Sequence, residues 1–178
     1  MDIKILRDDP ATWRILEERA RALMVQEHAA ETEVGEEILT FRLGEGDYSV
    51  PAQYVREVQL LGEVTPLPFT PPFLVGLVNV RGRLLVALDI RPLLDMPEAP
   101  PQPQAFLLVL TANGLEVGLL ADVVVEVRRS DDQLAPVLSS AAGRGVAWVR
   151  GVDRHLSVLL DPPALLSDPR LLINGAPQ

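Results

Sequence analysis

The chain has 178 residues, a net charge of −9 and no cysteine. Its length suits one compact domain or two small ones, and the lack of cysteine excludes disulfides, thiol catalysis and Cys-ligated zinc. The acidic charge disfavours nucleic acid and anionic membranes as partners. Because the chain has no signal sequence and no apolar run of about 18 residues, we expect a soluble protein in a reducing compartment. Its core should be aliphatic, since only 4% of the residues are aromatic.

Residues 10–30 are predicted to form an amphipathic helix, followed by an acidic linker over residues 31–36. Asp9 can cap this helix, and Pro10 suits its first turn. Large apolar residues recur at spacings of three and four on one helical face; these are Trp13, Leu16, Ala20, Leu23 and Met24. This face either packs against the rest of the protein or docks on a partner, and the sequence leaves both roles open.

From Ile38 onward the chain has the alternating apolar pattern of β-strands. We predict strands at 38–43, 48–50 and 55–61, a helical turn at 52–54, a Pro-rich loop at 62–72, and a hairpin whose turn spans residues 79–82. Pro51 ends the second strand, because proline cannot donate a ladder hydrogen bond.

A second set of strands follows a Pro-rich spacer over residues 92–103. We predict strands at 106–110, 115–120, 123–128, 146–151 and 156–160, a polar loop at 130–145, and a short helix at 162–167. Asn113 and Gly114 mark a tight hairpin turn between the first two of these strands, because both residue types tolerate positive φ.

The two halves of this region are similar in sequence. Asp89 and Asp161 lie 72 residues apart, and each precedes a Leu-Leu pair in a predicted turn. The segment Val-Arg-Glu-Val recurs as Val-Val-Glu-Val, which separates Glu57 from Glu126 by 69 residues. Two markers displaced by similar distances indicate a duplicated unit of about 70 residues. The repeat predicts two small, similar β-barrels with a cleft between them.

No catalytic or cofactor-binding set is recognisable in the sequence. The phosphate-binding pattern GxxxxGK[ST] and the nucleophile pattern GxSxG are both missing. We interpret His155, beside Asp153, as a turn residue, and the ligand clustering that a metal site needs is lacking. Asp89 and Asp161 are predicted to cap the helical turns that follow them. The sequence therefore favours a protein that is not an enzyme and that uses no cofactor or metal.

These segments resemble the chemotaxis coupling protein family, that is, the CheW-like domain. The resemblance rests on Val55-Arg56-Glu57-Val58, on FLVGLVNVRG from Phe73 to Gly82, and on Asp89-Ile90-Arg91. It continues in the second half and covers about residues 37–167. The resemblance implies an all-β fold of two pseudo-repeated, five-stranded SH3-like barrels around a shared aliphatic core, and the sequence adds an N-terminal α-helix.

We accordingly divide the chain into an N-terminal helix and linker at 1–36, a CheW-like domain at 37–167 and a C-terminal tail at 168–178. Within the domain, the first barrel is expected at about 37–95 and the second at about 104–167.

The resemblance further implies a non-catalytic adaptor that couples the cytoplasmic tips of chemoreceptors to the regulatory domain of a CheA-type histidine kinase. Such an adaptor lies in the cytoplasm at membrane-associated receptor arrays and does not insert into the membrane. The positions expected to bind partners are Val55, Arg56, Glu57, Gly76, Asn79, Arg81 and Gly82. An internal pair with Glu57 is an equal alternative for Arg81, and Val55 can equally belong to the core. A barrel that binds a small ligand is the alternative function, which the few aromatic residues disfavour.

Overall fold

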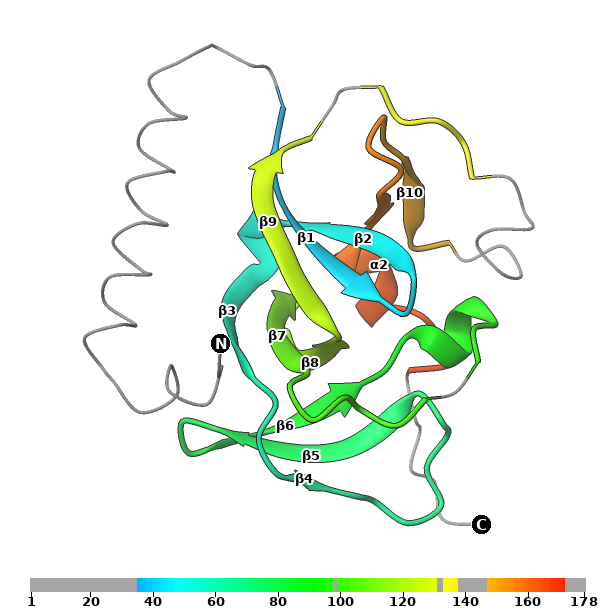
Figure 1. The fold of residues 1–178 in the computed structure, drawn as a ribbon. Helices are drawn as coiled ribbons and strands as arrows, with labels where there is room; N and C mark the ends of the chain where they lie inside the picture. Colours follow the sequence, from blue (N-terminus) through cyan, green and yellow to red (C-terminus); the bar gives the residue numbers. More distant parts are fainter. Residues whose placement is uncertain (1–34, 98, 131–132, 138–146, 172–178) are drawn as a thin grey trace, which may run out of the picture. The chain divides into compact units, whose positions relative to one another are not determined.

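The computed structural model describes residues 35–97, 99–130, 133–137 and 147–171 (Figure 1). The predicted helix at 10–30, its linker up to residue 34 and the chain after residue 171 lie outside the described residues. Within the described ranges the chain forms two β-sheets and only short helices, which confirms the all-β prediction.

The five-stranded sheet has the strand order β10-β11-β2-β1-β9. Its strands are β1 (Glu37–Leu43), β2 (Gly46–Pro51), β9 (Val123–Arg129), β10 (Val149–Val152) and β11 (Val158–Leu160). All neighbours are antiparallel except β2 and β11, which run parallel. Figure 1 shows that β9, from the second half of the chain, lies beside β1 from the first half.

The six-stranded sheet has the order β3-β7-β8-β6-β5-β4. Its strands are β3 (Val55–Leu60), β4 (Val64–Thr65), β5 (Leu74–Val80), β6 (Arg83–Leu88), β7 (Phe106–Ala112) and β8 (Leu115–Ala121). The sixth strand arises because two residues of the predicted Pro-rich loop, Val64 and Thr65, pair with β5 at the sheet edge. The short helices are η2 (Ala52–Tyr54), η3 (Arg91–Leu94) and α2 (Pro162–Leu166).

Neither sheet is built from one half of the chain, which corrects the predicted barrels at 37–95 and 104–167. The β1–β2 hairpin joins β9, β10 and β11, whereas the β7–β8 hairpin joins β3, β4, β5 and β6. Each sheet therefore combines the opening hairpin of one repeat with the later strands of the other. A sequence repeat identifies which segments are alike but not which segments pair.

The strand register confirms the duplication itself. Thr40 lies opposite Glu126 where β1 pairs with β9, and Val109 lies opposite Glu57 where β7 pairs with β3. In both pairs the register slips at the next residue, so even the irregularity is repeated. The parallel neighbours match as well, since Ser49 lies beside Leu159 and Gly118 beside Ala87.

The largest apolar cluster lies between the sheets and draws on both repeats, as the predicted shared core requires. It includes Phe41 and Val50 from one sheet, Leu108 and Leu119 from the other, and Trp148, all at most 1% exposed. A second apolar cluster, which we call the inner cluster, covers the other face of the six-stranded sheet. Its buried members are Val78, Val80, Leu85, Ala87, Leu107, Val109 and Leu120.

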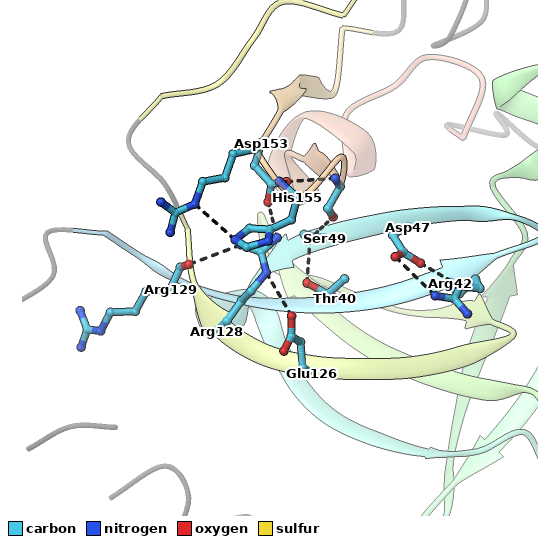
Figure 2. A network of polar contacts seen from close by, with 11 residues as sticks. Thr40, Arg42, Asp47, Ser49, Glu126, Arg128, Arg129, Asp153 and His155 are labelled. Atoms are coloured by element: carbon cyan, nitrogen blue, oxygen red, sulfur yellow. Dashed lines mark hydrogen bonds and ion pairs between the residues drawn. The ribbon is translucent and has the colours of Figure 1, made fainter. Parts of the chain in front are cut away.

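The corresponding face of the five-stranded sheet carries buried hydroxyl groups beside the apolar Ile38 and Leu159. The hydroxyls of Thr40 and Ser49 lie 3.0 Å apart, and Ser49 also contacts Ser157. All three residues are buried. Beside them, the buried carboxylate of Asp153 pairs with Arg128 of β9 (Figure 2). Hydrogen bonds satisfy the three hydroxyls and the Asp153 carboxylate, which removes most of the penalty for burying them, whereas Nε of Arg128 has no hydrogen-bond partner among the described residues.

The helix caps agree with the sequence in one repeat only. Asp161 caps α2, because its Oδ1 accepts a hydrogen bond from the Ala164 N–H at 3.1 Å. Asp89 does not occupy the cap position of η3, which is Ile90. Its carboxylate instead accepts from the backbone N–H and the guanidinium of Arg91, at 3.0 and 2.8 Å. The Asp89–Arg91 pair is almost fully buried.

Residues 168–171, predicted as part of the tail, are fixed to the domain. The indole N–H of Trp148 donates to Asp168 at 2.9 Å, and Leu171 packs against the shared core. Arg170 also donates to this carboxylate, and these bonds lower the pKa of Asp168 to about 2.

Candidate partner-binding site

The predicted partner-binding residues lie on two segments, the edge strand β3 and the β5–β6 hairpin. The Nε atom of Arg81 lies 3.0 Å from Oε2 of Glu57, so the two segments are joined by an ion pair. The Glu57 side chain is 18% exposed, whereas that of Arg81 is 80% exposed. The pair with Glu57, one of the two alternatives predicted for Arg81, is therefore formed, yet most of the Arg81 side chain still faces solvent.

Asn79 and Gly82 shape the turn that presents Arg81. The side-chain oxygen of Asn79 accepts a hydrogen bond from the Gly82 N–H at 2.8 Å. Arg81 and Gly82 have φ values of +52° and +83°, the pattern of a type I′ hairpin turn. A non-glycine residue in this region costs about 1 kcal/mol, so the hairpin holds Arg81 in a conformation that it would not otherwise prefer.

Gly76 and Val55 have packing roles. A Cβ atom at Gly76 would lie 2.3 Å from the carbonyl oxygen of Thr65, so a side chain would separate β4 from β5. Gly151 makes the equivalent approach to the carbonyl oxygen of Ala135 in the other sheet. Val55 is half-buried and packs against the shared core. Gly76 therefore allows β4 to approach β5, and Val55 attaches β3 to the shared core.

Sequence reasoning missed two further charged residues at this place, Arg83 and Glu116. Arg83 pairs with Glu116 and also has its Nη2 atom 3.8 Å from Oε1 of Glu57. Glu116 in turn lies 3.5 Å from Nη1 of Arg56. No sequence signal marks Glu116, because it reaches the site through the pairing of β8 with β6, which joins the two repeats.

These five residues form one line of alternating charge, which we call the Arg–Glu chain: Arg81, Glu57, Arg83, Glu116 and Arg56. Its two carboxylates are at most 20% exposed, whereas its arginines are 37% to 80% exposed. Arg83 and Glu116 lie on the same face of their strands as the inner cluster, two residues before Leu85 and Gly118. The chain therefore borders the inner cluster and presents mainly guanidinium groups to solvent.

The equivalent place on the five-stranded sheet is arranged differently (Figure 2). Glu126, the counterpart of Glu57, is 55% exposed and lies 3.4 Å from Nε of Arg128. Arg128 turns inward to the buried carboxylate of Asp153. Burial would raise the pKa of Asp153, but hydrogen bonds from Arg128 and from the Ser157 and His155 N–H groups outweigh it and lower this pKa. His155 is an exposed turn residue, as predicted.

Across the described part of the chain, no group of three or more His, Cys, Asp or Glu residues is placed to bind a metal ion. In the same residues, no helix has the length and hydropathy needed to cross a membrane. The exposed guanidinium groups of the Arg–Glu chain can bind carboxylates through charge and hydrogen bonding, with bidentate contacts as the strongest form.

The all-β fold of two sheets is accompanied by a match to one family. The CheW-like domain family model matches residues 37–170. The chain belongs to the CheW-like domain family.

Related proteins cover most of the same region. The "Probable chemotaxis protein CheW" of Rhizobium etli is 29% identical over 136 residues, which are 74% of this chain and 88% of the relative. "Protein FrzA" of Myxococcus xanthus is 36% identical over 137 residues, or 74% of this chain and 86% of the relative.

A solved structure has the same fold. The crystal structure of scaffolding protein TtCheW from Thermoanaerobacter tengcongensis superposes with a TM-score of 0.64 and 22% identity. The match covers 72% of this chain and 90% of that one.

Proposed function

We propose that this chain is a non-catalytic adaptor in chemosensory signalling. In this role it couples the cytoplasmic tip of a chemoreceptor to the regulatory domain of a CheA-type histidine kinase. Family membership supports the general role, since relatives carry the names chemotaxis protein CheW and scaffolding protein. The adaptor would work in the cytoplasm, at receptor arrays that the membrane holds through the receptors.

The observation that carries the proposal is the exposed Arg81 on its rigid hairpin, paired with Glu57. A receptor tip is a helical hairpin, and a helix docks through apolar anchors bordered by charged contacts. Exposed leucines accompany the charges here, since Leu84 next to Arg83 is 68% exposed and Leu115 next to Glu116 is 46% exposed. Arg56, Glu57 and Arg81 would contact the partner, while Val55, Gly76, Asn79 and Gly82 hold them in place.

Co-elution with purified partners tests the proposal. Wild-type protein is expected to form complexes with a receptor tip hairpin and with the kinase regulatory domain from the same genome. Glu57→Lys or Arg81→Asp should weaken one of these complexes at least tenfold, because each places a like charge beside its former partner.

Thermal melting separates binding from folding in these variants. Their melting temperatures should stay near that of the wild type, because Arg81 is 80% exposed and an ion pair with so exposed an arginine contributes at most about 1 kcal/mol. Arg42→Asp is the matched control, since Arg42 is an exposed, ion-paired arginine on the other sheet. A sharp fall in melting temperature for Glu57→Lys and Arg81→Asp would show that these residues serve the fold and would refute the proposed site.

A further inference from the structure

One carboxylate oxygen of the Arg–Glu chain has no hydrogen-bond partner among the described residues, and this affects which partners the chain can bind. Oε1 of Glu57 is buried and accepts no hydrogen bond from any described residue. Nη2 of Arg83 lies 3.8 Å from this oxygen, too far for a hydrogen bond. Arg83 instead contacts Glu116 closely. Glu116 thus holds Arg83 away from Glu57, and Glu57 remains the close partner of Arg81.

The balance of charge in the chain is positive. Three arginines face two glutamates, so this spot carries a charge of +1 on a protein whose total charge is −9. The carboxylates are the better covered members, and a partner would meet the guanidinium groups first. An anionic partner fits this surface, while the rest of the acidic protein repels it.

An apolar contact lies on the other face of the same strands. Ala87 of β6 lies beside Gly118 of β8 in the parallel pair, and Leu84 and Leu115 precede these residues by three positions each. Leu84 and Leu115 therefore sit at the same level of the sheet, where both are exposed. A helix that crosses the starts of β6 and β8, where Arg83 and Leu115 are the first strand residues, would meet the charges of one face and the leucines of the other, and it would need carboxylates beside aliphatic side chains.

We propose that Glu116 is a specificity-determining residue of this site and that the matching partner is an acidic amphipathic helix. Glu116 neutralises Arg83 and Arg56, so that acidic helices in general bind weakly and only a partner with matching apolar anchors binds well. Discrimination of this kind arises from weakening the wrong partners, not from strengthening the right one. The inference deepens the proposed function, because it concerns the same site and the same receptor helix.

Removing the Glu116 charge tests the inference. In Glu116→Gln the local charge rises to +2, and Arg83 is free to approach Glu57 or the partner. We expect affinity for a control helix of repeated Glu and Ala residues to rise about fivefold at low salt. Affinity for the receptor tip hairpin should change less, so the ratio of the two affinities falls. At about 1 M salt the gain should vanish, because the Debye length is then about 3 Å.

Asp47→Asn provides the matched control. Asp47 lies 69 residues before Glu116 at the equivalent strand position, and it also pairs with an arginine, Arg42. This substitution should leave both affinities unchanged. If Glu116→Gln leaves the affinity ratio unchanged, or weakens both complexes together with a lower melting temperature, Glu116 is merely structural and the inference is wrong. Failure of the wild type to bind any receptor tip would instead contradict the adaptor proposal.

Discussion

The two sheets share a backbone plan but differ in what they enclose. At equivalent positions the six-stranded sheet has Val109, Gly118 and Leu85, where the five-stranded sheet has Thr40, Ser49 and Ser157. The first set belongs to or borders an apolar cluster, and the second forms a line of hydroxyl contacts. The two repeats therefore share register and turns, while only the five-stranded sheet has hydroxyl groups at these interior positions.

This difference favours the pairing of each repeated hairpin with one particular set of strands. The chain contains two copies of each strand, and each copy could pair in either sheet if only the apolar pattern decided. A hydroxyl placed in the apolar interior would lose its hydrogen bonds, at a cost of about 1–3 kcal/mol. The polar set on β1, β2 and β11 thus favours the observed exchange of strands over pairing with the wrong copy.

The largest effect is expected from breaking the buried ion pair of the five-stranded sheet. Asp153→Ala leaves the guanidinium of Arg128, 13% exposed, without its main partner. The loss should be about 3–4 kcal/mol of unfolding free energy, measured by urea denaturation. Asp47→Ala, at the exposed Arg42–Asp47 pair of the same sheet (Figure 2), should cost less than about 1 kcal/mol. Equal losses at the two positions would contradict the importance of burial.

A hydroxyl placed in the apolar sheet sharpens the comparison. Gly118→Ser introduces a Cβ atom 2.5 Å from Cδ1 of Leu107, so Leu107 must move. The new hydroxyl also faces hydrocarbon where its counterpart Ser49 finds two hydroxyls. We expect a loss of about 2–3 kcal/mol in urea denaturation. Gly118→Ala separates the steric clash from the unpaired hydroxyl. It adds the same Cβ atom without the hydroxyl, so its loss of unfolding free energy should be smaller.

At Trp148, too, the second repeat has a buried polar group where the first repeat has an apolar one. Its counterpart is Phe73, because their carbonyl oxygens accept from the equivalent N–H groups of Asp161 and Asp89. Phenylalanine needs no hydrogen-bond partner, whereas the buried indole N–H of Trp148 donates to Asp168. The second repeat therefore depends on a carboxylate that the first does not need.

Acid should reveal that dependence. Hydrogen bonds from Arg170 and Trp148 lower the pKa of Asp168 to about 2, below its ordinary value of 3.8. The stabilisation is therefore complete above about pH 4 and is lost as the pH falls towards 2, up to about 2 kcal/mol. Asp168→Asn should be less stable than the wild type at pH 7, and the difference should shrink between pH 4 and pH 2. A difference that does not change with pH would contradict this account.

The smallest of these effects concerns the hydroxyls of the five-stranded sheet. Ser49→Ala removes the central group between Thr40 and Ser157 and should cost about 1 kcal/mol in thermal or urea denaturation. Replacing all three, as Thr40→Val, Ser49→Ala and Ser157→Ala, should recover part of this loss, because no buried hydroxyl is left unpaired. An additive loss in the triple variant would contradict the hydrogen-bonding explanation.

Local features of the fold were predictable from the sequence. The turn at Asn113-Gly114 adopts positive φ, as both residue types favour, and so does Gly82 in the other hairpin. Asp161 caps its helix, and Glu57 and Glu126 occupy equivalent places in the two sheets. These features depend on neighbours in sequence or on the repeat, and both are visible in one chain.

Features that depend on pairing between the repeats were not predictable. Glu116 reaches Arg83 only because β8 runs beside β6, and Thr40, Ser49 and Ser157 meet only because β11 runs beside β2. The position of Asp89 before a predicted turn indicated a helix cap. In the structure its carboxylate instead pairs with the guanidinium of Arg91, and a charged hydrogen bond of this kind is stronger than a neutral one. Gly76 was predicted to bind a partner; the structure shows its close approach to Thr65, and its role in binding stays a prediction.

Calorimetric titration of a receptor tip hairpin into wild type, Arg81→Asp and Arg42→Asp tests the central claim most directly. The account predicts binding by the wild type and by Arg42→Asp, and a loss of at least tenfold in affinity for Arg81→Asp with unchanged melting temperature. Equal binding by all three proteins would contradict the placement of the receptor site on the β5–β6 hairpin.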